Sequence, residues 1–240
     1  MAASQERASL MAHSIKDAST EVRIGFVRKV YSILSVQLLV TALIAAPLSL
    51  AQGFVRRNAW LAYLSVGMLC ITLCVTICCQ DVLRQFPQNY IFLSVFTVFE
   101  AVLVGFVSAI YTWQSVALAA GVTALIFMCM TLYAWNTSTD FTGFGPYLFG
   151  ALLALTIFGL VLSILGLLGV ELQWLVMLYD GLGVLLFTMY IVFDTQMILG
   201  EWGGHKNQFS IDDYCFAALN LYLDIIQLFL HLLRLLGERK

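Results

Sequence analysis

The chain has 240 residues, of which 61% are hydrophobic and only 11% charged, and its formal net charge is −2. A water-soluble domain of this size needs far more charge on its surface, so the composition indicates a membrane protein. The basic patches of a nucleic-acid-binding protein are missing, and we expect no nucleic-acid partner. The six cysteines form no C-x-x-C pair, which argues against a zinc site or a disulfide framework.

The apolar runs divide the chain into a short tail and one membrane domain. Residues 1–27 are polar and of mixed charge, and we expect a soluble N-terminal tail there. Residues 28–240 contain no linker-like tract and are predicted to form a single transmembrane bundle. A helix that crosses the hydrocarbon core needs about 20 mostly apolar residues. Seven runs qualify: 31–52, 59–79, 90–111, 114–134, 146–168, 173–199 and 213–236. The predicted fold is therefore an all-α, polytopic transmembrane bundle of about seven helices.

The lysines and arginines give a weak signal for orientation. In a seven-span arrangement, seven of them lie on the N-terminal side of the membrane and five on the other side. The positive-inside rule then favours a cytosolic N-terminus. A six-span arrangement with a re-entrant last helix would return the three C-terminal charges to the cytosol, so the side of the C-terminus stays open.

Four acidic residues lie inside predicted spans, where an ionisable side chain costs at least a few kcal/mol and calls for a reason. Glu100 is either a protonated acid bonded to a neighbouring helix or a ligand on a cation path. Asp180 and Asp194 share one face of the sixth span, about 21 Å apart along its axis. Asp180 is nearer to a span end and is either an interfacial acid or a further path ligand. The fourth acid is Asp224.

The last span carries a polar seam, defined here as Asn220, Asp224, Gln227, His231 and Arg234. The spacings of 4, 3, 4 and 3 residues put these side chains on one face of a helix that is otherwise rich in Leu, Ile and Phe. A lipid-facing helix would not hold such a face, so this helix faces other helices or water. The seam is either an inter-helix hydrogen-bond ladder or the lining of an ion path, with Asn220, Gln227 and His231 as further candidate ligands.

The strongest candidate site combines Asp194 with Asp224. Two carboxyl groups brought close together titrate as one unit. Such a pair can hold a proton in one state and a hard cation such as Ca²⁺ in another. The predicted span ends put the two residues at depths that differ by about 9 Å, a mismatch that a longer sixth helix or a later seventh helix would remove.

Around these residues the sequence resembles the Bax inhibitor/lifeguard family of seven-helix membrane proteins. The resemblance covers about residues 23–237 and includes the segments 26–39 and 139–149, and its most specific segments are 187–196 and 219–234. It implies a central seventh helix, a pH-sensitive calcium leak, and roles in intracellular calcium stores and in resistance to cell death, usually at the endoplasmic reticulum or Golgi. The family's di-aspartyl site maps onto Asp194 and Asp224, and a basic latch maps onto Arg84.

Enzymatic functions fit the sequence poorly. Tyr179-Asp180 resembles the first catalytic dipeptide of intramembrane aspartyl proteases, but the Gly-x-Gly-Asp partner is absent from the next span. A membrane metallohydrolase needs several ligands at membrane depth, whereas His13 and His205 fall in soluble segments. We expect no enzyme and no cofactor, with calcium only as a permeant ion bound transiently at the pair. Expected partners are membrane lipid, calcium ions, protons and membrane proteins that control calcium release or cell death. A non-conducting scaffold or interaction protein is the alternative function.

Overall fold

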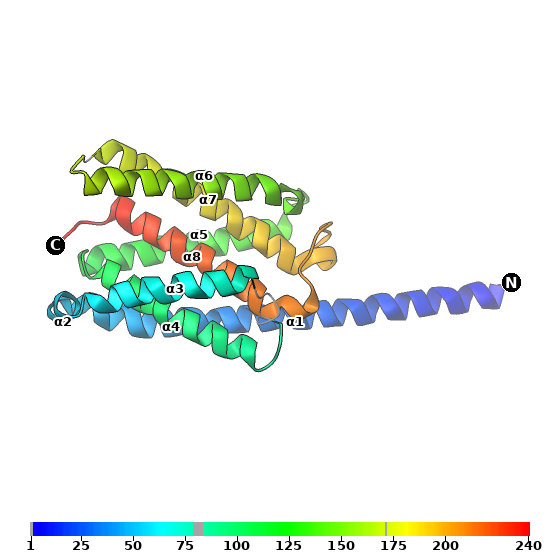
Figure 1. The fold of residues 1–240 in the computed structure, drawn as a ribbon. Coiled ribbons are helices and arrows are strands. Elements are labelled where there is room, and N and C mark those ends of the chain that lie inside the picture. The colour runs from blue at the N-terminus through cyan, green and yellow to red at the C-terminus, as the bar shows by residue number, and fades with distance from the viewer. Residues whose placement is uncertain (1, 79–83, 171) are drawn as a thin grey trace.

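The computed structural model describes residues 2–78, 84–170 and 172–240, with side chains from residue 20 onward except 73, 76 and 77. Its elements, in chain order, are α1 (Ala2–Leu50), α2 (Gln52–Arg57), α3 (Trp60–Cys78), α4 (Gln88–Ser108), α5 (Trp113–Asn136), η2 (Thr142–Phe144), α6 (Gly145–Leu167), α7 (Gln173–Leu199), η3 (Gly200–Gly203), η4 (Ile211–Asp213) and α8 (Tyr214–Leu236). The long helices lie side by side in one bundle (Figure 1). The predicted all-α transmembrane bundle is confirmed for the part of the chain that the structure describes.

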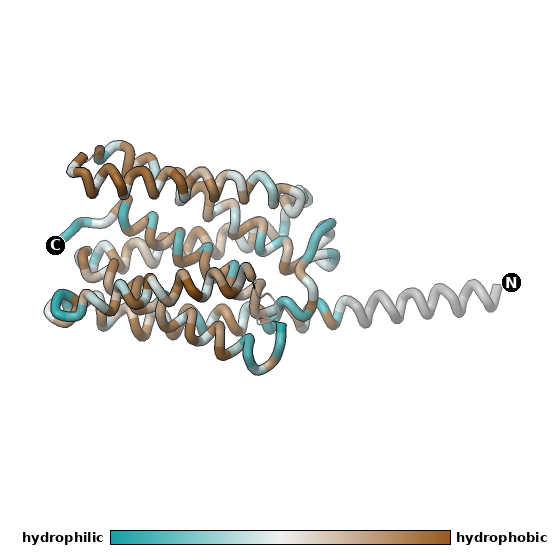
Figure 2. Tube along the Cα trace, viewed as in Figure 1, coloured by the Kyte–Doolittle hydropathy of each residue, from teal (hydrophilic) through white to brown (hydrophobic). Residues whose placement is uncertain are grey.

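Six helices within the described ranges are long and apolar enough to cross a membrane. They correspond to six of the seven predicted spans, and the boundaries of α7 coincide with the predicted range 173–199. The other predicted span, 59–79, corresponds to α3, whose uninterrupted described part is the shorter apolar segment Trp60–Thr72. Residue 79 lies outside the described residues. Apolar residues dominate along the bundle, while polar residues gather at its ends (Figure 2).

The N-terminal segment is helical and runs without a break into the first span. α1 has 49 residues, which corresponds to a length of about 74 Å, and its first half projects beyond the bundle (Figure 1). The segment that can cross the membrane is Thr20–Leu50, so it begins well before the predicted start at residue 31. Good helix formers such as Ala, Glu, Lys and Met fill the tail, and they allow the helix to continue outside the apolar run.

The C-terminal helix α8 lies at the centre of the bundle, as the family resemblance predicted. It packs against α1, α4, α5 and α7, and 78% of its apolar window is buried, compared with at most 50% for the other candidate spans. Fully enclosed side chains such as Leu221, Tyr222 and Leu228 belong to it. A polar residue on α8 therefore faces other helices rather than lipid, and it needs partners within the protein.

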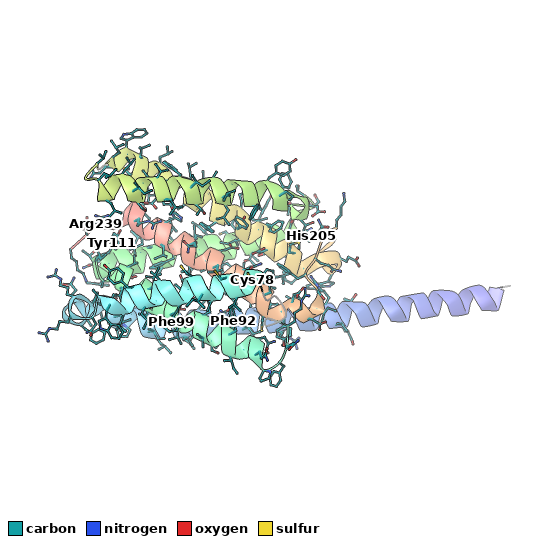
Figure 3. The ribbon with its side chains drawn as sticks, viewed as in Figure 1. Cys78, Phe92, Phe99, Tyr111, His205 and Arg239 are labelled. Carbon is teal, nitrogen blue, oxygen red and sulfur yellow. The ribbon has the colours of Figure 1, made fainter. Side chains whose placement is uncertain are left out.

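The chain end returns to the turn between α4 and α5. Lys240 donates its backbone N–H to the carbonyl of Ile110 (2.9 Å), and Thr112 donates its own to the carbonyl of Glu238 (3.0 Å). Tyr111 and Arg239 form an isolated antiparallel bridge between them and lie close together at the end of the bundle opposite the N-terminus (Figure 3). The two termini thus lie at opposite ends of the bundle (Figure 1).

Candidate functional site

Five ionisable side chains meet at the face between α7 and α8: Asp180, Asp194, Asp224, His231 and Arg234. The two helices run in opposite directions and are joined by the segment 200–213 (Figure 1). Asp180 and Asp194 both lie on the face of α7 that contacts α8, two heptads apart. Each finds partners on α8, Asp194 near the middle of that helix and Asp180 near its C-terminal end.

Asp194 and Asp224 are in contact at the centre of the bundle. Their side chains are hydrogen-bonded to each other, and the residues are only 3% and 6% exposed. A hydrogen bond between two carboxyl groups needs a proton on one of them, because an ionised carboxylate only accepts. Oδ2 of Asp224 is buried and has no hydrogen-bond partner among the described residues. The two residues thus form one buried carboxyl pair with an acceptor oxygen left over.

The predicted span ends put Asp194 and Asp224 at different depths, and the sixth span in the structure ends later than predicted. The helical segment continues from Leu199 through η3, so that the span reaches Gly203 rather than residue 199. Gly200 ends α7 with a positive φ of 57°, a conformation that other residues rarely adopt, and the short 3-10 helix η3 begins there. The contact between Asp194 and Asp224 shows that the two residues lie at the same depth.

Asp180 belongs to a second cluster on the same helix pair. Its Oδ1 lies 2.9 Å from Nδ1 of His231 and accepts a hydrogen bond from Nε of Arg234 (2.8 Å). Asp180 and His231 are almost completely buried, whereas the Arg234 side chain is 33% exposed. Tyr179 and Phe187 pack against the imidazole ring. Asp180 is therefore a buried residue that pairs with Arg234 and contacts His231.

The other predicted path residues are spread over the helices around Asp224. Glu100 on α4 is 4% exposed and lies within electrostatic range of the Tyr222 hydroxyl, which is 2.8 Å from the hydroxyl of Thr41 on α1. Asn220 and Gln227 are only partly buried, and neither side chain is hydrogen-bonded to another described residue. The polar seam on α8 thus separates into two buried contacts with α7 and two less buried amides.

Arg84 lies away from the carboxyl pair. Its guanidinium group bonds to the carboxylate of Asp213, with Nε 2.6 Å from Oδ1. Asp213 precedes Asp224 by eleven residues, which corresponds to about 16 Å along a helix. This ion pair ties the segment before α4 to the N-terminal end of α8. A latch formed by it would therefore act on that end of the helix and not on Asp224 itself.

Sequence reasoning missed a buried arginine near the start of the first span. Arg23 donates hydrogen bonds to the backbone carbonyls of Met197 (2.7 Å), Phe209 (2.8 Å) and Leu199 (3.3 Å). These carbonyls belong to the end of α7 and to the segment that leads to α8. In the sequence, Arg23 contributes only to the count of positive charges on the N-terminal side of the membrane. Its place one helical turn before the apolar pair Phe26-Val27 was nevertheless a signal that this arginine could be buried.

The segment 201–212 is held against the loop between α5 and α6. Asp140 accepts hydrogen bonds from the hydroxyl of Thr142 (2.7 Å) and from the backbone N–H of Lys206 (3.2 Å). The Thr142 hydroxyl bond is the main reason why the pKa of Asp140 lies below its usual value. Burial lowers the pKa of His205, whose Nδ1 is 3.8 Å from Oδ1 of Asp140 and which is labelled in Figure 3.

Within the described residues, no group of three or more His, Cys, Asp or Glu side chains could hold a metal ion. The Asp194–Asp224 pair supplies two carboxyl groups, whereas bound Ca²⁺ takes six to eight oxygen ligands. Water molecules or backbone carbonyl groups would have to supply the remaining oxygen ligands. Two carboxyl groups alone therefore do not make a complete calcium site.

The fold and this face together define a polytopic α-helical membrane protein with ionisable groups enclosed around a central C-terminal helix. Residues 23–240 match the family model described as "Inhibitor of apoptosis-promoting Bax1". The chain is 37% identical over 222 residues to Protein lifeguard 3 of Homo sapiens, covering 91% of this chain and 70% of that protein. It is also 37% identical over 223 residues to Protein LIFEGUARD 4 of Arabidopsis thaliana, covering 90% and 85%. The chain belongs to the Bax inhibitor/lifeguard family of membrane proteins, a family linked to the inhibition of apoptosis.

Proposed function

We propose that this protein is a calcium leak channel of intracellular membranes, opened and closed by protonation of the Asp194–Asp224 pair. The observation that carries the proposal is the hydrogen bond between these two buried carboxyl groups. It joins α7 to the central helix α8, so a change in its protonation acts where the bundle is most tightly packed.

The chemistry of the pair gives the direction of the pH response. With a proton between them, the two carboxyl groups bridge α7 and α8 and attract no cation. When the proton leaves, two negative charges face each other in a medium of low dielectric constant and repel strongly. Separation of the helices or entry of a cation relieves this repulsion. Acid therefore favours the closed, cation-free state, and higher pH favours conduction.

Glu100 is proposed as a further ligand on the same path, and the other polar residues of α8 and Asp180 as secondary ones. Glu100 is buried on α4, which packs against α8. An ion that leaves the carboxyl pair would meet oxygen atoms from more than one helix. By controlling the calcium content of the endoplasmic reticulum or Golgi, such a leak would affect cell survival, in keeping with the family's link to apoptosis. The N-terminus is proposed to lie in the cytosol.

The test is calcium flux into proteoliposomes of the purified protein between pH 6 and pH 8. Asp194→Asn and Asp224→Asn replace one carboxyl group of the pair by a group of similar shape that cannot ionise at these pH values. Flux in the native protein should rise with pH, and each variant should lose most of that dependence. Asp212→Asn, which changes an exposed acid at the start of the α8 segment, is the matched control and should behave like the native protein.

The same experiment separates conduction from a scaffold function. If folded native protein carries no calcium above the level of empty liposomes, a non-conducting scaffold that regulates cell death or stress signalling becomes the better reading. If calcium passes but the two variants keep the native pH response, the protein is a leak that this pair does not control. Glu100→Gln should reduce flux while leaving the pH dependence intact.

A further inference from the structure

A groove between α1 and α4 opens toward the surrounding lipid in the half of the bundle nearer the N-terminus. Its volume is about 380 Å³. Val36 on the α1 wall is 60% exposed, and Val98 on the α4 wall is 43% exposed. Ser94 on the α4 wall is exposed as well. A molecule within the bilayer can therefore reach both walls of the groove.

The two walls run in the same direction and in register. α1 and α4 pack against each other, and both run away from the N-terminal end of the bundle (Figure 1). Gln37 donates to the hydroxyl of Thr97, 60 residues further along the chain (3.0 Å), and Gly105 packs closely against Ala45 with the same offset. The start of α4 therefore lies beside Lys29 on α1.

The α1 wall of the groove leads to two cations. The wall is formed by residues that recur at the spacing of one helical turn. They are Ser32, Ile33, Val36, Gln37 and Val40. Arg28 and Lys29 come one turn before Ser32 and Ile33 on the same face, and both are exposed. The groove thus has a positively charged mouth at its N-terminal end.

The positive charge at this mouth is not neutralised within the protein. Neither Arg28 nor Lys29 forms an ion pair with another described residue. The ammonium group of Lys29 lies 3.2 Å from the centre of the Tyr214 ring, and Asp213, next to Tyr214, is already paired with Arg84. An ammonium group has three N–H donors, so Lys29 can bond to an anion while it stays against the ring.

The length and the charge of the groove together select its occupant. The distance from Lys29 to Val40 is about 16 Å along the helix, which corresponds to one leaflet of a hydrocarbon core about 30 Å thick. The apolar side chains of the walls suit an acyl chain. A neutral lipid such as a sterol would leave both cations without a counter-charge, whereas an anionic headgroup supplies one.

We propose that this groove binds one acyl chain of an anionic phospholipid, with the headgroup bonded to Arg28 and Lys29. The cytoplasmic leaflet is the one that carries anionic lipid, and the proposed cytosolic N-terminus puts the mouth of the groove in that leaflet. The lipid site stands on observations separate from the proposed calcium leak, and its test needs no transport.

The test is photolabelling of the full-length protein in phosphatidylcholine nanodiscs. A small amount of phosphatidylserine with a photoactivatable group on its acyl chain is included, and the labelled peptides are identified. They should come from 29–40 and 90–98. Added unlabelled phosphatidylserine should suppress the labelling. Soluble glycerophosphoserine, which has the headgroup but no acyl chain, and neutral diacylglycerol, which has the chains but no charge, should not.

Variants separate this site from general attraction between basic residues and lipid. The double variant Arg28→Gln, Lys29→Gln should lower the affinity for phosphatidylserine about 5- to 25-fold, since each cation near an anionic headgroup contributes about fivefold. Arg56→Gln with Arg57→Gln is the matched control, because these arginines are also adjacent and exposed but follow the other end of α1. It should bind like the native protein.

Ser94→Phe, at an exposed position in the wall of the groove, should block the acyl chain and reduce labelling at least tenfold. If Ser94→Phe does not fold, the two double variants still decide, because they change only exposed side chains. Equal losses in the two double variants, labelled peptides outside the groove, or competition by diacylglycerol or by glycerophosphoserine would each overturn the assignment.

Discussion

Nδ1 of His231 on α8 lies 2.9 Å from Oδ1 of Asp180 on α7, with both side chains shielded from solvent. Arg234 donates to the same carboxylate oxygen from one turn further along α8 (2.8 Å). Nη2 of Arg234 also lies 2.9 Å from Nδ1 of His231, so Asp180, His231 and Arg234 form one cluster in which each side chain contacts the other two. This cluster and the Asp194–Asp224 pair join α7 to α8 by polar contacts at two levels, near the C-terminal end of α8 and near its middle.

Removing the charge of Asp180 should destabilise the protein. Asp180→Asn leaves Arg234 without its carboxylate inside the bundle. Breaking a buried ion pair costs about 3–5 kcal/mol, and partial exposure of the Arg234 side chain (33%) reduces that, so we expect about 2–4 kcal/mol. The thermal midpoint in detergent should fall by roughly 5–15 °C.

The control for Asp180→Asn is Asp212→Asn, at an exposed position, which should shift the midpoint little. Arg234→Gln combined with Asp180→Asn should cost less than the sum of the two single changes, because both remove the same interaction. Additive effects of the two substitutions would contradict the proposed coupling between them.

Gly183 should not tolerate a side chain. A methyl group there would overlap the ring of His231, which cannot move aside because Phe187 and Tyr179 pack against it and Asp180 holds it. Gly183→Ala should cost about 1–3 kcal/mol by overpacking, measured as a lower thermal midpoint.

Gly181 is a matched control for Gly183 on the same helix. An added methyl group there meets nothing within 4 Å, so Gly181→Ala should be neutral or gain up to about 1 kcal/mol from helix propensity. Equal thermal midpoints for the two variants would mean that the ring of His231 can shift after all.

The sequence predicted the helices of this bundle better than it predicted their contacts. Hydrophobic length located six spans, and the 4-3-4-3 spacing identified the polar face of α8, because both signals are local to one helix. The partner of each polar residue depends on how helices align across long sequence distances. Asp194 and Asp224 could be paired through the family resemblance, whereas the contact of Asp180 with His231 needed the actual alignment of α7 and α8. Arg23 was missed for the same reason, since its partners are backbone carbonyls more than 170 residues away.

Arg23 should control local opening at the end of α7. Each of the three nitrogen atoms of its planar guanidinium group donates to a different carbonyl group. A hydrogen bond from a charged donor contributes about 1.5–3 kcal/mol to stability. In Arg23→Ala, amide hydrogen exchange of residues 197–209 should speed up at least tenfold. Arg23→Lys should restore only part of the protection, because a single ammonium group cannot reach all three carbonyls.

Arg28 provides the control for Arg23, since it lies on the same helix in an exposed position. Arg28→Ala should leave exchange in 197–209 unchanged. A uniform increase over the whole bundle in Arg23→Ala would point to global destabilisation and would count against a local clamp.

The segment 201–212 should loosen in weak acid because of His205. Burial lowers the pKa of this imidazole below its value in the unfolded segment, about 6.5. The open segment therefore binds a proton more readily than the closed one, and the stability of the closed state falls as pH drops below about 6.5. Asp140 acts in the same direction at lower pH, since its pKa is also depressed and its protonation weakens the bond to Lys206.

Hydrogen-exchange protection of residues 203–209, corrected for intrinsic rates, should be lower at pH 5 than at pH 7.5. In His205→Gln this difference should shrink while protection at pH 7.5 changes little. A native protein with equal protection at both pH values would show that the imidazole stays accessible to protons in the closed segment.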